Sequence, residues 1–203
     1  MGCHQFSERR DEQIPLKFFT AIKPGRSHSG QLDALSVMRL SMKINRIDDR
    51  DKSRALAIYR DCAQWLHDKG VEQWGHYLTE EAQPLVDRRF REGEVYMATV
   101  DGQDAAVIVL QWEDGFWGER GKDPNAGFLH SIAVRRKFSG KGLGRELISW
   151  AMGIARERGK SVIRLDCIKA NPKLLRYYGD LSFEEAGVVN WKGTEIQLLE
   201  RRL

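Results

Sequence analysis

Cysteine is scarce in this sequence, and its few copies lie far apart. Three occur in 203 residues, at Cys3, Cys62 and Cys167, and none forms a CxxC pair. This count and spacing argue against a disulfide framework and against a structural zinc site. Free thiols are typical of a reducing compartment, so we expect a cytoplasmic protein without a bound metal.

Long apolar runs are also missing. No uninterrupted apolar segment approaches the roughly 18 residues that a bilayer-spanning helix needs. Arg9 and Arg10 are not followed by an apolar stretch, which argues against a secretion signal. The sequence therefore predicts no membrane partner.

The charge is not strongly of one sign. Thirty-three basic residues face 29 acidic ones, a net charge of +4. Such a balance suits a nucleic acid or a small polyanion equally, so charge alone does not decide between them. Because no aromatic motif of the RNP type is present, we expect no nucleic-acid partner.

What the chain does contain is enough apolar material, 41%, for one sizeable core. Residues 1–40 differ from the rest because they are polar and rich in turn residues, as in Pro24-Gly25 and Ser29-Gly30. We interpret residues 1–40 as a loosely ordered N-terminal extension and residues 41–203 as one domain.

Hydrophobic periodicity predicts strands and helices in alternation through the domain. Asp101-Gly102 marks a hairpin turn between two of the strands, and 113–125 is expected to be a loop. Strands are expected at 42–47, 94–100, 105–111, 127–134, 162–168, 183–188 and 195–199, and helices at 52–70, 79–93, 143–159 and 172–179. This order indicates a layered α/β structure.

The stretch SGKGLGRELISW, residues 139–150, places three glycines directly before a helical pattern. A glycine-rich loop at a helix start exposes backbone N–H groups without side chains to block an approaching ligand. The helix adds partial positive charge there, and Lys141 and Arg145 add full charges. Phosphate is the ligand that such a loop favours, which indicates a pyrophosphate site.

Other interpretations of these glycines fit less well. Gly159-Lys160-Ser161 resembles the end of a Walker A loop, but Ile154 occupies the position of its first glycine. The dinucleotide motif GxGxxG has a different spacing and lies near the first strand of its fold. A tight turn without any ligand stays open as the remaining alternative.

The glycines belong to a longer ordered series. Phe128–Val134 (FLHSIAV) comes first, then Gly140–Gly144 (GKGLG), then Leu165-Asp166-Cys167, Asn171 and Tyr177-Tyr178. This series resembles the GNAT superfamily of acetyl-CoA-dependent N-acetyltransferases over about Met42–Leu203. Ser139 departs from the Gln or Arg that opens the family's loop motif, and Ser182 departs from the glycine expected before Phe183.

The resemblance implies an α/β fold with a mixed, mostly antiparallel central sheet of about six or seven strands, flanked by about four helices. It also implies acetyl-CoA as the acetyl donor. The residues that would bind acetyl-CoA are Ile132, Val134, Ser139, Gly140, Lys141, Gly142, Leu143, Gly144, Arg145 and Asn171.

By the same resemblance, Tyr178 is the acid that protonates the sulfur of coenzyme A, and a packed core tyrosine is its alternative role. The base is expected to be His130, whose ordinary pKa suits the task; a structural histidine is the alternative, and Glu113, Asp114 and Asp166 are further candidates. Regular alternation along its strand would put His130 on one face with Ile132 and Val134.

The implied activity is transfer of an acetyl group to a primary amine of a small molecule or peptide, in a protein that could be a homodimer. The alternative is a non-catalytic acetyl-CoA sensor or scaffold, which the Ser139 departure favours. The acidic and aromatic loop Trp112–Trp117, with Trp74 and Tyr77 opposite, is a candidate wall for a cationic amine.

Overall fold

The computed structural model describes residues 42–71 and 73–203, so the predicted extension 1–40 lies outside the described part of the chain. Its strands are β1 (Met42–Arg46), β2 (Glu94–Val100), β3 (Gln103–Gln111), β4 (Ala126–Val134), β5 (Val162–Ile168), β6 (Glu184–Trp191) and β7 (Thr194–Arg202). Its α-helices are α1 (Lys52–Asp68), α2 (Ala82–Glu92), α3 (Leu143–Glu157) and α4 (Pro172–Gly179).

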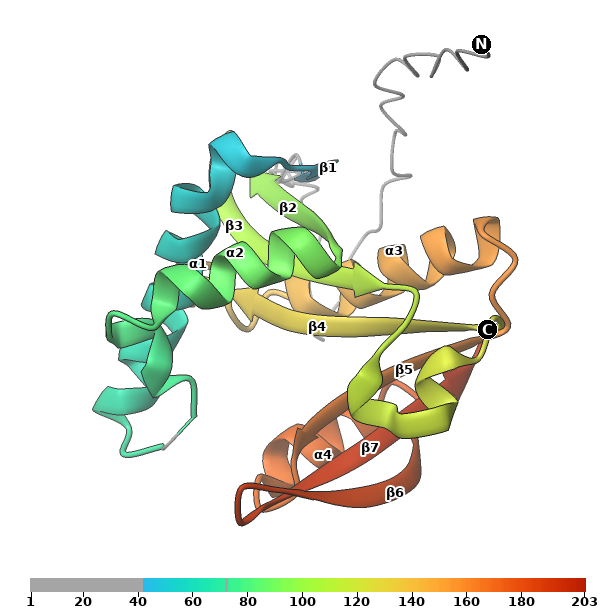
Figure 1. The fold of residues 1–203 in the computed structure, drawn as a ribbon. Coiled ribbons are helices and arrows are strands. Elements are labelled where there is room, and N and C mark those ends of the chain that lie inside the picture. The colour runs from blue at the N-terminus through green and yellow to red at the C-terminus, as the bar shows by residue number, and fades with distance from the viewer. Residues whose placement is uncertain (1–41, 72) are drawn as a thin grey trace, which may run out of the picture.

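The seven strands form one sheet in the order β1-β2-β3-β4-β5-β7-β6 (Figure 1). All neighbours are antiparallel except β4 and β5, which are parallel. The predicted mixed, mostly antiparallel sheet is therefore confirmed. Within the described residues, no helix has both the length and the apolarity to cross a bilayer.

Local sequence explains most element boundaries. Asp101 and Gly102 have φ values of 49° and 76°, the left-handed pair that a two-residue hairpin between β2 and β3 requires. The second helix begins later than predicted, at Ala82, although the Thr79 hydroxyl still accepts a hydrogen bond from the N–H of Glu81 at 3.3 Å. The expected loop at 113–125 contains the short 3-10 helix η3 (Gly115–Lys122).

Apolar residues on the two faces of the sheet form separate clusters. One face packs under α1 and α2, where Ala55, Ile58, Tyr59, Ala63, Ala82 and Val86 are fully or nearly fully buried. The other face packs under α3 and α4, where the buried residues include Leu143, Leu147, Ile148, Ala151, Ala155 and Tyr178. Each fully buried large apolar side chain contributes roughly 1.5–3 kcal/mol.

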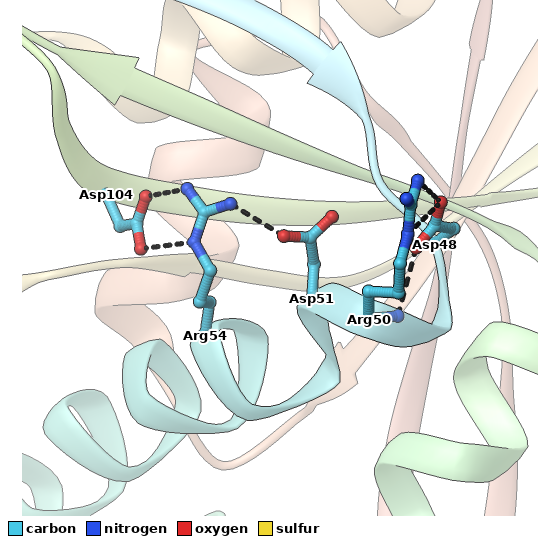
Figure 2. A network of polar contacts seen from close by, with 5 residues as sticks. All are labelled: Asp48, Arg50, Asp51, Arg54 and Asp104. Atoms are coloured by element: carbon cyan, nitrogen blue, oxygen red, sulfur yellow. Dashed lines mark hydrogen bonds and ion pairs between the residues drawn. The ribbon is translucent and has the colours of Figure 1, made fainter.

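A polar network fixes the start of α1 against the sheet (Figure 2). The Arg54 guanidinium donates to Asp104 of β3, with Nε to Oδ2 at 3.0 Å, and to Asp51 Oδ1 at 2.6 Å. Asp48, just before, accepts from the N–H of Arg50 at 2.9 Å and caps a 3-10 turn. These contacts join the helix that covers one face to the edge of the core strands.

The middle of β4 contains a bulge that changes which side chains share a face. Val107 lies opposite Ala133 and Val109 lies opposite His130, so two residues of β4, Ser131 and Ile132, face the single residue between the valines. Ser131 has a φ of 50°, as a bulged position often does.

Directly opposite residues in an antiparallel pair share a face. Because Val107 and Val109 belong to the cluster under α1 and α2, His130 and Ala133 lie on that face. Ile132 and Val134 pack against the cluster under α3. The expectation that His130 shares a face with these two residues is therefore wrong, and the extra residue of the bulge is the reason.

β4 and β5 separate before the bulge is reached. Their parallel pairing covers Ala126–Phe128 against Val162–Arg164 and no more, although β4 continues to Val134 and β5 to Ile168. The two strands consequently diverge toward their carboxyl ends, as the ribbon shows (Figure 1). This divergence leaves backbone groups of both strands without a partner strand in the middle of the sheet.

Candidate functional site

A groove of about 1060 Å³ occupies the region where β4 and β5 diverge. Of the residues that the sequence assigns to acetyl-CoA binding or to proton transfer, those that line it are His130, Ile132, Val134, Asp166, Asn171 and Tyr178. The predicted loop Ser139–Arg145 does not line this groove. Since both faces of the sheet contribute lining residues, the groove passes between the strands from one side to the other.

The glycine loop lies between the 3-10 helix η4 (Arg136–Phe138) and α3. Gly140 and Gly142 have φ values of 74° and 82°, and no atom lies within 4 Å of the position a Cβ would take at either. The first hydrogen bond of the helix runs from the N–H of Glu146 to the C=O of Gly142 at 3.1 Å. The N–H groups just before it point out of the helix end and are open to a ligand.

Gly144 serves close packing. A Cβ at this position would lie 2.9 Å from the Tyr177 hydroxyl and 3.8 Å from Val134 Cγ2. A larger residue here would require the Tyr177 side chain to move, so the glycine favours the close approach of the first turn of α3 to α4. The start of α3 is thereby held next to the end of the groove that Val134 lines.

The basic residues around the loop differ in how they are engaged. The Arg136 guanidinium stacks 3.8 Å from the centre of the Trp65 ring, and the Arg136 N–H donates to Asp61. Lys137 donates to Gln103 at 2.6 Å. Among the described residues, neither Lys141 nor Arg145 forms an ion pair, so their charges are available to an anion at the loop.

The end of β4 turns polar backbone groups into the gap. The N–H of Arg135 donates to the C=O of Ala105 in β3 at 2.9 Å. Successive residues of a strand direct their amides to opposite sides, so the N–H of Val134 points away from β3 and toward β5. The C=O of Val134 accepts from Cys62 Sγ at 3.2 Å, which holds the next peptide unit, between Val134 and Arg135.

Three ionisable side chains meet on the α1 and α2 side of the gap. His130 Nε2 and Asp114 Oδ2 are 3.3 Å apart, and each side chain is only 10% exposed. Asp166 of β5 offers a third ligand atom, and the three atoms lie within 4.8 Å of one another. Neither His130 Nε2 nor Asp114 Oδ2 has a hydrogen-bond partner among the described residues. This set has the composition to hold a cation, whether a metal ion or an ammonium group.

The two carboxylates of this set differ electrostatically. Burial pushes the pKa of Asp114 upward, but the close contact with His130 and its charge, together with the hydrogen bond that the Phe116 N–H donates, outweigh burial and lower that pKa overall. Burial raises the pKa of Asp166, and the charges of His130 and Arg89 only partly oppose the rise. Asp114 is thus held as the anion next to the imidazole, while Asp166 has the greater affinity for a proton.

Comparisons with known proteins connect this geometry to a family. The model of the acetyltransferase (GNAT) family matches residues 59–183, which is more than half of the chain. The chain belongs to the GNAT acetyltransferase family. GNAT proteins are acetyl-CoA-dependent N-acetyltransferases, so the coarse activity predicted from the motif series is confirmed.

Relatives agree with this membership. The uncharacterized N-acetyltransferase YesJ of Bacillus subtilis is 32% identical over 130 residues, covering 62% of this chain and 72% of YesJ. A GNAT acetyltransferase structure from Listeria monocytogenes is 26% identical, with a TM-score of 0.68, and covers 83% of this chain and 99% of its own. The yncA structure from Salmonella typhimurium, solved with its cofactor acetyl-CoA, is 20% identical with a TM-score of 0.57, over 80% of this chain and 94% of its own, and shows the fold.

In this GNAT domain Tyr178 lies on the side of the gap opposite to His130. Its ring is 7% exposed, lines the groove and packs edge-on against Tyr177 and Phe183. Burial, followed by the neighbouring Cys167 and Tyr177, raises the pKa of the Tyr178 phenol well above its ordinary value. The phenol therefore stays protonated at neutral pH and makes no hydrogen bond to a described residue.

Asn171 has a clear structural task in addition to its place at the groove. It is the N-cap of α4, and its Oδ1 accepts from the N–H of Leu174 at 3.1 Å. Pro172 follows as the first helical residue, an order that favours helix initiation. The side-chain oxygen of Asn171 is thus engaged within the protein.

The predicted aromatic wall is only partly present in this GNAT groove. Trp74 and Tyr77 line it, but Trp112 and Trp117 do not. Trp117 is buried against Phe128 and lies under the guanidinium of Arg164, so it belongs to the core. The loop contributes Asp114 to the site instead of its aromatic rings.

Sequence reasoning missed several charged lining residues, among them Arg89 of α2. Its position was detectable, because Arg89 follows the fully buried Ala82 and Val86 by seven and three residues. That spacing places an arginine on the inward face of an amphipathic helix. An arginine on an inward face is unusual unless it has a partner or a ligand.

Proposed function

We propose that the protein transfers an acetyl group from acetyl-CoA directly to a primary amine of a small molecule or peptide. The observation that carries the proposal is the gap between β4 and β5. The glycine loop of α3 lies on one face of the sheet at this gap, and the His130–Asp114–Asp166 set lies on the other face. A donor and an acceptor approaching from opposite faces would meet between the strands.

The donor side has the groups that acetyl-CoA needs. The pyrophosphate would bind the open N–H groups of residues 140–145, with Lys141 and Arg145 balancing its charge. Ser139, Gly140, Gly142, Leu143 and Gly144 form the cradle. The pantetheine arm would follow the unpaired edge of β4 at Ile132 and Val134, where the Val134 N–H is free to polarise the thioester carbonyl. The fold neighbour yncA binds acetyl-CoA, which supports this choice of donor.

The acceptor side has a route for the proton. An alkylammonium has a pKa near 10.4, so an amine acceptor must lose a proton before its lone pair can attack. His130 is the proposed base, and Asp114, 3.3 Å away, stabilises the imidazolium that results. Asp166 lies beside them and attracts the incoming ammonium.

Acetyl transfer then needs one bond made and one broken. The nitrogen forms a bond to the carbonyl carbon and loses its second proton to solvent, the carbon–sulfur bond breaks, and the departing thiolate takes a proton from Tyr178. The raised pKa of the buried phenol keeps that proton available. Solvent returns the proton to Tyr178 after release of coenzyme A and collects the one held by His130.

A panel of primary amines, assayed by release of free thiol from acetyl-CoA, tests the proposal. Each positive acceptor is confirmed by mass spectrometry as a product heavier by one acetyl group. Turnover with at least one amine, lost on changing His130→Gln, is the expected result. Acetyl-CoA binding by calorimetry without turnover on any amine would instead indicate a non-catalytic binding module.

A further inference from the structure

Arg89 is a charged residue of the groove for which the protein provides no partner. It is half-buried on α2 and lines the groove, and its guanidinium forms no hydrogen bond or ion pair with any described residue. Its neighbour Arg88 is exposed and pairs with Glu92, Nε to Oε2 at 2.8 Å. The helix therefore carries one arginine, Arg88, that is paired at the surface, and a second, Arg89, whose unpaired guanidinium lines the groove.

The position of Arg89 argues against a role in holding the diphosphate. α2 covers one face of the sheet, and α3, whose start forms the glycine loop, covers the other. Arg89 therefore shares its face with His130, on the acceptor side of the gap. An anionic group bound by Arg89 would belong to the acceptor.

Asp166 lines the same groove as Arg89, and Asp114 meets Asp166 beside His130. The charge of Arg89 lowers the pKa of both Asp114 and Asp166, yet its guanidinium forms an ion pair with neither. His130 Nε2 and Asp114 Oδ2 are buried without hydrogen-bond partners among the described residues. The acceptor side thus presents a free cation and an acidic set, separated from each other.

This separation matches a zwitterion. A guanidinium is always charged, and its planar fork fits the two oxygens of a carboxylate. A half-buried guanidinium without a partner loses hydration, so a carboxylate ligand restores favourable contacts that the empty site lacks. The acidic set supplies the corresponding contacts for an ammonium group.

We propose that the acceptor is an amine that also carries a carboxylate, of the amino-acid type, with the carboxylate on Arg89 and the amine directed to His130 and the two aspartates. This inference depends on the proposed acetyl transfer and narrows its substrate class. Arg89 is then a specificity residue, and the walls formed by Trp74 and Tyr77 contact the remainder of the substrate.

The test compares each of the common L-amino acids with its carboxamide and its decarboxylated amine in the thiol-release assay. At least one amino acid should be acetylated with a kcat/KM about tenfold or more above that of both analogues, because a charge-assisted contact is lost in each. Arg89→Met should raise KM for that amino acid by a similar factor, change kcat little and leave KM for the carboxamide unchanged. Arg88→Met is the matched control and should alter none of these values.

Three results would overturn the inference. They are equal use of amino acids and their carboxamides, equal effects of Arg88→Met and Arg89→Met, and weakened acetyl-CoA binding in Arg89→Met. If no amine releases thiol, acetyl transfer itself fails. Calorimetry of the same amino acids with the wild type and Arg89→Met, in the presence of coenzyme A, then still decides whether Arg89 binds a carboxylate. Thermal melting of both variants checks that each is folded.

Discussion

Replacing Gly142 by aspartate tests the placement of the donor most directly. Gly142 is the N-cap of α3, has a φ of 82°, and has no atom within 4 Å of the position of an added Cβ. The new side chain therefore fits without collision, but it places a carboxylate among the N–H groups assigned to the diphosphate. Acetyl-CoA binding should weaken while the fold persists.

The expected loss follows from charge. Two unit charges about 4 Å apart repel by about 4 kcal/mol at an effective dielectric constant near 20, and solvent screening at an open loop reduces this to about 1–3 kcal/mol. Since about 1.4 kcal/mol is a factor of ten, the Kd for acetyl-CoA should rise about tenfold to hundredfold.

Backbone strain must be separated from this effect. A non-glycine residue in a left-handed conformation costs about 1–2 kcal/mol. Gly159, just past the other end of α3, has a φ of 72° and equally open surroundings, so Gly159→Asp carries the same strain. An acid at a helix C-terminus is also less favourable than one at an N-terminus, by about 0.3–1 kcal/mol at each end. The control should therefore melt no higher than Gly142→Asp.

Calorimetric titration of both variants with acetyl-CoA, together with thermal melting, completes the test. Gly142→Asp should lose affinity, whereas Gly159→Asp should bind like the wild type despite a Tm lower by about 2–8 °C. Unchanged affinity in folded Gly142→Asp, or equal losses in the two variants, would falsify the assignment of the diphosphate to this loop.

Three further changes address catalysis and stability. Tyr178→Phe should lower kcat by about a hundredfold or more and leave the Kd for acetyl-CoA unchanged, whereas Tyr177→Phe should leave kcat unchanged. Equal kcat values in the two variants would contradict the role of Tyr178 as the acid. Asp166→Asn should raise the Tm at pH 7, because burial raises the pKa of Asp166 and its ionisation opposes folding; the gain should vanish below the ordinary pKa of 3.8, and a gain independent of pH would contradict this cause. Arg54→Met should cost less than about 1 kcal/mol in a urea titration, since the Arg54 side chain is 47% exposed; a loss of several kcal/mol would show that its network is far stronger than surface pairs.

Most of the fold follows from local sequence. Strand β5 at 162–168 and helix α4 at 172–179 have the bounds that their apolar patterns and flanking residues predict. The hairpin at Asp101-Gly102 follows from turn chemistry alone. These signals are short-range, so no knowledge of distant neighbours is needed to read them.

The site was less predictable because it depends on long-range geometry. The faces occupied by His130 and Val134 depend on a bulge that the residue types in Phe128–Val134 do not predict. Ser131 adopts a positive φ there although it is not a glycine. The proximity of Asp114 to His130 depends on how a loop folds back across the sheet. The aromatic rings of that loop were assigned to a substrate wall, yet Trp117 is core, because its packing against Phe128 is invisible in the sequence.

The brevity of the β4–β5 ladder has a mechanical consequence. A ladder of only three residue pairs joins the four-stranded part of the sheet, β1 to β4, to the three-stranded part, β5 to β7. It pairs Ala126–Phe128 with Val162–Arg164. A ligand bound between the unpaired edges of β4 and β5 would connect the two parts of the sheet at a second place, beyond that short ladder. Ligand binding would then slow amide hydrogen exchange along the unpaired edges of β4 and β5 and reduce the motion of the two parts of the sheet relative to each other.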